Sequence, residues 1–285
     1  MSRNSDKLVR EKKEQLQQAA PQPASNPGQI FGLNFVTPVE TVKLPSAGKF
    51  YPKTSPLFGV ESVKIRHMTS KEEDLLSTAS NREDSFEVYD LLIDSLLVDK
   101  NLNSSVFSEE DKMAVILNSR ITGYGPEYKT SLYCQSCKKP TKHVFDLSKN
   151  CVKPAKIESE YLPDEDLFEC VLPKSKISVK ILSSSDKISE ELSIEKKQKE
   201  KYNLPFNQTV SFISKAIVSA NGISDKNQIT KLAEILPAID AKYIKEFFVS
   251  SRPSISTSQL VKCQECLTET EQEAPITWAF FRTDF

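Results

Sequence analysis

The sequence predicts an α+β fold, in which two β-hairpins that each carry a pair of cysteines come together. A helical N-terminal part precedes them, and a subdomain of one β-hairpin and several helices is inserted between them. Two observations lead to this prediction. A Cys-x-x-Cys doublet occurs twice, at 134–137 and 263–266, each time between extended segments. Elsewhere the apolar periodicity changes between two residues, typical of strands, and 3.6 residues, typical of helices.

The composition is that of a globular chain without a strong net charge. The 285 residues are 38% hydrophobic and carry 38 basic against 39 acidic side chains, so no overall field attracts nucleic acid or an anionic membrane. No apolar run approaches the roughly 20 residues that span a bilayer, and the N-terminus lacks the apolar core of a signal peptide. We therefore expect a soluble intracellular protein, whose six cysteines bind metal or stay reduced.

Three parts are expected along the chain. Residues 1–34 are rich in Lys, Glu and Gln and are interrupted by prolines, which predicts a disordered or partner-ordered tail. Residues 35–150 and 254–285 are expected to form the α+β core with the cysteine doublets. Residues 151–253 are expected to form the inserted subdomain.

In the N-terminal part, strands are predicted at 39–44 and 60–68, separated by a stiff turn at 44–52 with two prolines and two aromatic residues. Ser70 and Glu73 match a capping box, which predicts a helix at 70–78. Further helices are predicted at 86–98 and from 108 to about 121. The acidic residues at 72–74 and 109–111 fall in first turns, where the helix dipole accounts for them, so we expect them to be solvated.

The doublets predict one metal site. Strands are predicted at 128–133 and 141–147 around the first doublet, and at 259–262 and 270–278 around the second. Two thiolates on each turn can bind one cation together, so Cys134, Cys137, Cys263 and Cys266 are predicted to hold one structural zinc ion, with no position left for a catalytic water. The doublets are separated by far more than the ~15–20 residues of a compact zinc ribbon. The predicted fold is therefore a split, zinc-ribbon-like pair of β-hairpins.

Other interpretations of the doublets stay open. A redox dithiol is expected at the start of a helix, whereas these doublets lead into strands. An iron site of the rubredoxin type usually carries glycine after each doublet, where this chain has Lys138 and Leu267. The missing glycines also weigh against an ideal zinc turn, so a site without metal is a third interpretation. His143 is expected to be an ordinary strand residue, because four sulfurs already complete a tetrahedral shell.

Within the inserted part, a β-hairpin is predicted at 167–172 and 176–182, with one face of branched apolar residues. A very polar helix, capped by Ser184 or Ser185, is predicted to end near residue 201. Three shorter helices are predicted at 208–220, 226–236 and 239–250.

The sequence carries no phosphate-binding glycine loop, nucleophile elbow or metalloprotease motif, and it holds only seven glycines and two histidines. We therefore expect no catalysis, no catalytic residue and no small-molecule substrate. The alternative to a structural protein is a zinc-ribbon adaptor or nucleic-acid-binding factor, which six lysines between 138 and 156 would favour. Acidic residues at 158–169 and around the second doublet are expected to cancel much of that positive field.

Several segments, taken in order, resemble one protein family. They are LPSAGKFY at 44–51, VKIRHMTSKEEDLL at 63–76, GYGPEY at 123–128, the two doublets and WAFF at 278–281. Together they resemble the baseplate hub assembly proteins of T4-type tailed bacteriophages, over most of 39–150 and 255–285. The resemblance implies a non-enzymatic assembly factor or minor component of the central hub, with other baseplate and hub proteins as partners. It places the protein in the host cytoplasm during assembly, or in the virion baseplate.

Exposed aromatic residues are the surfaces expected to contact those partners. They lie in the turn at 44–52 and at the C-terminus. The candidate partner-binding residues are Lys49, Phe50, Tyr51, Trp278, Phe280 and Phe281.

Overall fold

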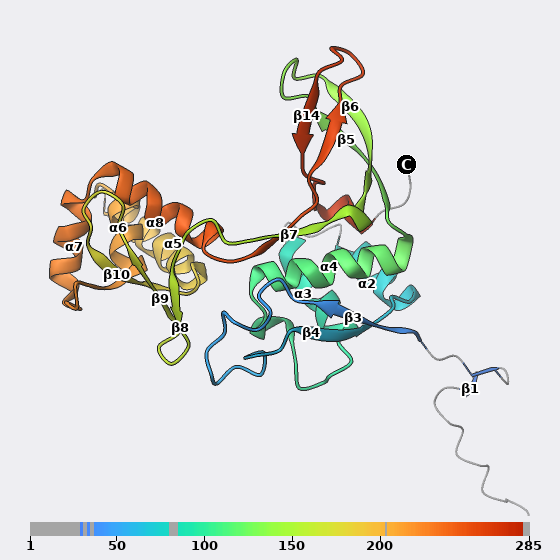
Figure 1. Cartoon of the computed structure of the whole chain (residues 1–285), viewed down its shortest axis with the longest axis horizontal. Helices are drawn as coiled ribbons and strands as arrows, with labels where there is room; N and C mark the ends of the chain where they lie inside the picture. The colour runs from blue at the N-terminus through green and yellow to red at the C-terminus, as the bar shows by residue number, and fades with distance from the viewer. Residues whose placement is uncertain (1–28, 31–32, 35–36, 80–84, 203, 282–285) are drawn as a thin grey trace, which may run out of the picture. The chain divides into compact units, whose positions relative to one another are not determined.

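The computed structural model describes residues 29–30, 33–34, 37–79, 85–202 and 204–281 (Figure 1). The chain divides into two compact units, residues 1–38 and 39–285. In the first unit, strand β1 (Gln29–Ile30) pairs with β2 (Leu33–Asn34). The rest of the predicted tail lies outside the described residues.

The N-terminal part of the second unit is a two-stranded sheet with three helices. Strand β3 (Val39–Lys43) pairs antiparallel with β4 (Ser62–Arg66), which confirms both predicted strands. Their inward residues Val42, Val63 and Ile65 are buried because side chains alternate between the two faces of a strand. The elements that follow are α2 (Ser70–Ala79), α3 (Ser85–Leu96), the short 3₁₀ helix η1 (Ser104–Val106) and α4 (Glu109–Tyr124).

Helix α2 begins where predicted, but its cap lies one residue earlier. The Glu72 carboxylate accepts hydrogen bonds from the backbone N–H (2.9 Å) and the hydroxyl (2.7 Å) of Thr69. The Arg66 guanidinium donates two more, at 2.6 and 3.0 Å. The predicted Ser70–Glu73 capping box is therefore wrong by one residue, because Arg66 holds Glu72 against Thr69. The expected solvation of Glu72 is wrong as well, since it is 1% exposed.

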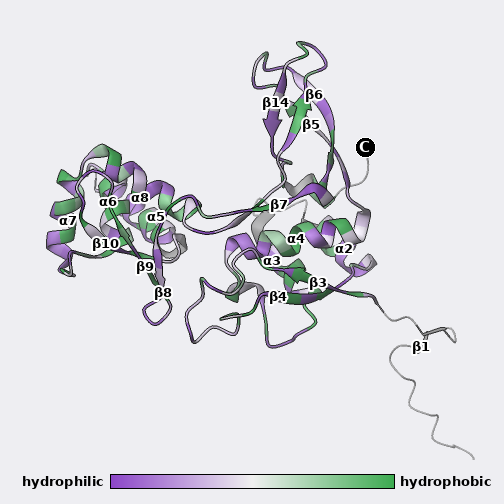
Figure 2. Ribbon diagram, viewed as in Figure 1, coloured by the Kyte–Doolittle hydropathy of each residue, from purple (hydrophilic) through white to green (hydrophobic). Residues whose placement is uncertain are grey.

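Two hairpins carry the cysteine doublets. Strand β5 (Glu127–Tyr133) pairs with β6 (Pro140–Asp146), and β13 (Gln259–Lys262) pairs with β14 (Glu269–Gln272). The strand predicted at 270–278 is thus shorter than expected. In Figure 1 the two hairpins lie side by side, with both cysteine turns at the same end. Figure 2 shows β14 as hydrophilic, in keeping with its sequence Glu-Thr-Glu-Gln.

The segment between the hairpins contains a four-stranded antiparallel sheet in the order β11-β10-β9-β8. The predicted hairpin is confirmed as β9 (Leu167–Val171) and β10 (Ser178–Leu182). The outer strands β8 (Glu160–Leu162) and β11 (Ile217–Ala220) were not predicted. The helices are α5 (Asp186–Lys201), α6 (Gln208–Ala216), α7 (Lys226–Ile235) and α8 (Ala238–Ser250).

The helix predicted at 208–220 is wrong in its last turn. Helix α6 ends at Ala216, and the next four residues form β11, which pairs with β10. The β-branched residues Ile217 and Val218 suit an extended backbone. Residues 217–220 form a strand instead of a helical turn because their backbone groups hydrogen-bond to the edge of β10.

A short strand pair closes the segment between the hairpins at its two ends. Strand β7 (Cys151–Lys153) pairs with β12 (Ser254–Ser256). The backbone N–H groups of Lys156 and Ile157 both donate to the Ser250 carbonyl, at 2.8 and 3.2 Å. The chain therefore enters and leaves this segment side by side.

The buried apolar residues form two clusters. The first draws on β3, β4, α3, α4, β5, β6 and the C-terminal 3₁₀ helix η3 (Trp278–Phe281); the second draws on β9, β10, α6, α7 and α8. The predicted α+β fold class is confirmed by this mixture of helices and small sheets. The predicted domain boundaries stay a prediction. Among the described residues, no helix has the length and apolarity needed to cross a bilayer.

Candidate metal centre

The structure brings the four predicted cysteines together. One sulfur from each of Cys134, Cys137, Cys263 and Cys266 lies within 4.8 Å of all the others. The Sγ atoms of Cys134 and Cys266 are 3.6 Å apart, and those of Cys137 and Cys263 are 3.7 Å apart. These separations are well beyond the ~2.05 Å of a disulfide, and all four cysteines are free thiols.

The sulfur spacing fits a tetrahedral metal ion. A Zn–S bond of about 2.3 Å in a regular tetrahedron places the sulfurs about 3.8 Å apart, close to the separations of 3.6 and 3.7 Å in these two pairs. Two of the ligands, Cys134 and Cys263, are buried, while Cys266 is exposed. The four residues could therefore hold one metal ion in a closed, zinc-ribbon-like site.

Each doublet lies in a turn of its own, and the two turns have the same backbone hydrogen bonds. In the first, Cys134 donates its N–H to the Lys139 carbonyl (2.9 Å), and Lys138 donates to the Cys134 carbonyl (2.9 Å). In the second, Cys263 donates to Thr268 (3.0 Å) and Leu267 donates to Cys263 (3.1 Å). The two hairpins thus present their thiols through equivalent backbone geometry.

The residue after each doublet has a left-handed backbone. Lys138 has φ of 59° and Leu267 has φ of 60°. This conformation is costly for residues with a Cβ atom and is usually occupied by glycine. The turn therefore has the glycine-like conformation expected of a zinc turn, although the sequence places other residues there.

Hydrogen bonds lower the pKa of two of the thiols, whereas burial and neighbouring thiols raise the pKa of a third. The backbone N–H of Cys137 donates to the Cys134 sulfur and lowers the pKa of that thiol. Hydrogen bonds with the Thr268 side chain and backbone lower the pKa of Cys266 to about 6. The Lys139 N–H acts in the same direction on Cys137, but burial and the neighbouring thiols outweigh it and raise the pKa of Cys137 to about 11. A divalent cation would supply the positive charge that four ionised sulfurs require.

Contacts outside the sulfurs join the two hairpins. The backbone N–H of Gln264 donates to the Thr141 hydroxyl at 3.2 Å, and Thr141 is 2% exposed. Lys139 pairs with Glu265 at 2.9 Å across the two turns. Neither contact follows from the doublet motif itself.

Acidic residues pair with three of the six lysines of the predicted basic run, at positions 139, 149 and 153, and also with Lys262. Four lysines of the hairpin region pair with nearby carboxylates; the pairs are Lys139–Glu265, Lys149–Asp146, Lys153–Glu273 and Lys262–Glu269. The charge cancellation expected from the acidic residues around the second doublet is therefore present at Lys139, Lys153 and Lys262.

A comparison with protein families matches residues 37–282 to the family described as T4 bacteriophage base plate protein. The chain belongs to this family. Searches of curated proteins and of solved structures returned no match. Membership implies that this baseplate protein associates with the virion.

The aromatic residues predicted to contact partners are mostly internal in the baseplate protein. Tyr51, Phe280 and Phe281 are 5%, 0% and 5% exposed, so their expected exposure is wrong. Phe50 is half-buried against Phe168 and Tyr161, at ring-centroid distances of 5.9 and 6.1 Å. Lys49 is exposed, and the side chain of Trp278 lies outside the described residues. Partner binding by these six residues stays a prediction.

Two long-range hydrogen bonds explain why these aromatic residues turn inward. The Tyr51 hydroxyl donates to the Asp111 carboxylate at 2.6 Å, and the Arg120 guanidinium donates to the Phe280 carbonyl at 2.9 Å. Asp111 also accepts hydrogen bonds from the backbone N–H and hydroxyl of Ser46. Asp111 is 0% exposed, so its expected solvation is wrong. The sequence shows the acidic first turn of α4 but not the loop that folds over it.

Proposed function

We propose that this baseplate protein is a non-enzymatic factor in the assembly of the central hub, acting as an assembly factor or as a minor hub component. The observation that carries the proposal is the family match over 37–282. The hub role itself rests on the resemblance of residues 44–51, 63–76 and 123–128 to hub assembly proteins. Other baseplate and hub proteins are its proposed partners, and the host cytoplasm is the proposed place of assembly.

We further propose that Cys134, Cys137, Cys263 and Cys266 bind one structural zinc ion. The support is the sulfur spacing, the repeated turn and the hydrogen bonds to the sulfurs. Four sulfur ligands would leave no open coordination position, so the ion would act as a clasp between the hairpins and contribute free energy of folding.

We also propose that residues 151–253, which lie between the two hairpins in the sequence, form an inserted subdomain whose two ends the zinc site holds together. Its own buried cluster and the β7–β12 pair at its ends support this proposal. Residues 35–150 with 254–285 would then form the core, and residues 1–34 a tail that is disordered or orders on a partner.

The proposal is tested by affinity capture from cells infected with the phage that encodes this chain. Tagged protein should co-purify with identified hub proteins, which are absent from uninfected cells and from an unrelated tagged bait. A salt titration with a DNA duplex tests the nucleic-acid-binding alternative, because binding through phosphate contacts weakens steeply as the salt concentration rises. Tight, salt-sensitive DNA binding without hub proteins would replace this function with the nucleic-acid-binding alternative.

A further inference from the structure

The β5–β6 hairpin has an outward face that the metal site does not use. Alternate residues of both strands turn inward, where Tyr128 and Phe145 are buried in the core. The others turn outward, where Lys129 lies opposite Val144 and Ser131 lies opposite Lys142. Val144 is 49% exposed on this face.

Lys129 and Lys142 differ from several of the lysines around them. Within the part of the chain that the structure describes, neither has an ion-pair or hydrogen-bond partner, whereas Lys139, Lys149 and Lys153 are each paired. Their register places their Cα atoms diagonally across the strand pair, about 7–8 Å apart. Two lysine side chains that leave the strands so close together carry like charges, and an anionic group between them would relieve their repulsion.

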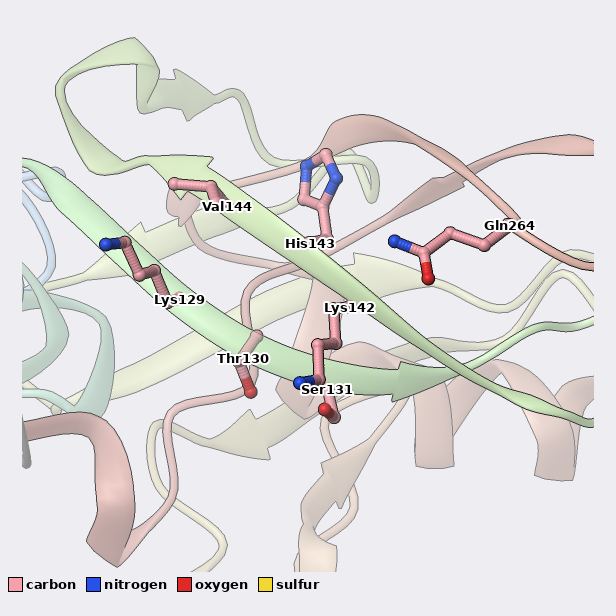
Figure 3. A pocket seen from close by; sticks show the side chains of 7 residues that line it. All are labelled: Lys129, Thr130, Ser131, Lys142, His143, Val144 and Gln264. Carbon is pink, nitrogen blue, oxygen red and sulfur yellow. The ribbon is translucent and has the colours of Figure 1, made fainter. Parts of the chain in front are cut away.

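A hollow of about 710 Å³ lies along the hairpin. It is lined by residues 129–131 of β5, residues 142–144 of β6 and Gln264 from the second cysteine turn (Figure 3). The Nε2 atom of His143 is buried there without a hydrogen-bond partner among the described residues. His143 lies opposite Thr130 in the register, on the other face of the hairpin from Lys129 and Lys142, so its unpaired atom is not part of the outward face.

The outer edge of β5 also presents backbone groups. The N–H of Cys134 donates to the Lys139 carbonyl, so the next pair, Tyr133–Pro140, is not hydrogen-bonded. By alternation, the backbone N–H and C=O groups of Lys129 and Ser131 point away from β6. The Glu127 carbonyl, which has the same orientation, accepts from Arg120 at 3.1 Å instead of from β6. In the described residues, β5 pairs with β6 alone.

We propose that the outer edge of β5 takes up an extended acidic segment of another baseplate protein as an added strand. Its backbone would pair with Lys129 and Ser131, and its carboxylates would lie over Lys129 and Lys142. This inference rests on the proposed function, because it requires baseplate partners. Two unpaired lysines suit an acidic peptide better than DNA, whose binding typically uses many phosphate contacts.

The direct test uses the full chain and overlapping synthetic peptides that cover the baseplate proteins of the same phage. Fluorescence anisotropy should identify an acidic peptide whose affinity falls about tenfold in Lys129→Met/Lys142→Met. The matched control, Lys149→Met/Lys153→Met, removes two paired lysines and should change the affinity less than twofold. Hydrogen exchange at the amides of Lys129 and Ser131 should slow when the peptide is bound.

Several results would overturn the inference. They are equal peptide affinity in both double variants, equal binding of a scrambled peptide, a DNA duplex as the tighter ligand, or unchanged exchange at residues 129 and 131. Lysines on a strand edge also prevent aggregation; a Lys129→Met/Lys142→Met variant that self-associates yet binds the peptide normally would support that role alone.

Affinity capture separates this inference from the proposed function. If wild type and Lys129→Met/Lys142→Met capture the same hub proteins equally, the proposed hub function is supported and the proposed strand addition at β5 is rejected. If neither captures hub proteins, the hub function itself fails.

Discussion

Lys138 and Leu267 occupy the same left-handed position, one residue after each cysteine doublet, with φ of 59° and 60°. The two residues differ in charge, shape and hydropathy, so their side chains do not explain the shared conformation. The equivalent hydrogen bonds of the two turns do, since Lys138 and Leu267 each donate to the carbonyl of the first cysteine. The turn geometry is thus imposed on residues that do not favour it.

Glycine at these positions should stabilise the protein. A left-handed residue with a Cβ atom costs about 1–2 kcal/mol, part of which is offset by the greater entropy of glycine in the unfolded chain. We expect Lys138→Gly and Leu267→Gly each to raise the free energy of unfolding by about 1 kcal/mol, measured by urea denaturation of the metal-loaded protein. Lys139→Gly, one residue further, should not raise it. A loss of stability in Lys138→Gly and Leu267→Gly would contradict the assigned turn geometry.

The proposed zinc site predicts a defined number of metal ions per chain. Elemental analysis should find about one zinc per chain, as expected of a Cys₄ site. Cys134→Ser should lose the metal and several kcal/mol of stability, because metal binding is coupled to folding. Cys151→Ser provides the control, since Cys151 is exposed and lies outside the cluster. Metal-free protein with the thermal stability of the zinc-loaded form would exclude a structural ion.

Asp111 should anchor the loop at 44–52. Asp111→Ala would leave the Ser46 N–H, the Ser46 hydroxyl and the Tyr51 hydroxyl without their acceptor in a buried place. We expect the free energy of unfolding to fall by about 3 kcal/mol. Asp90→Ala removes a carboxylate that is 40% exposed and paired with Lys112, and should cost less than about 1 kcal/mol. Equal losses in the two variants would argue against the buried anchor.

Glu72 should make the free energy of unfolding depend on pH in the acidic range. Burial opposes its ionisation, but hydrogen bonds from Arg66 and Thr69 outweigh burial and lower the pKa of Glu72 to about 2. Because the pKa is lower in the folded state than in the unfolded chain, the stabilisation is complete above about pH 5 and is lost as the pH falls towards 2. Glu72→Gln should therefore cost about 3 kcal/mol at pH 7, with the difference from wild type shrinking below pH 5.

Urea denaturation between pH 7 and pH 2 measures this difference. Glu61→Gln, at an exposed position, is the matched control and should follow the wild-type curve. A Glu72→Gln deficit that stays constant from pH 7 to pH 2 would show that the carboxylate charge is not its cause.

The sequence by itself determined the parts that depend on local pattern. Apolar alternation predicted β3, β4, β9 and β10, and helix periodicity with acidic first turns predicted α2, α3 and α4. The four cysteines were found from their spacing alone, because two Cys-x-x-Cys turns are recognisable without knowing how far apart they lie in the chain. Strands β7, β8, β11 and β12 were missed because each has only three or four residues, and β7, β11 and β12 also form by pairing with distant partners.

Only the tertiary structure decided which polar and aromatic residues turn inward. Asp111 and Tyr51 are 60 positions apart, and Arg120 and Phe280 are 160 apart, so no local pattern links them. Because of these hydrogen bonds, the acidic start of α4 and the aromatic residues near the C-terminus, both expected at the surface, are buried. The same long-range packing left Lys129 and Lys142 unpaired on the outer face of β5–β6. Sequence spacing identified the four cysteines of the candidate metal site, whereas the surface available to partners depended on contacts that form only when the chain has folded.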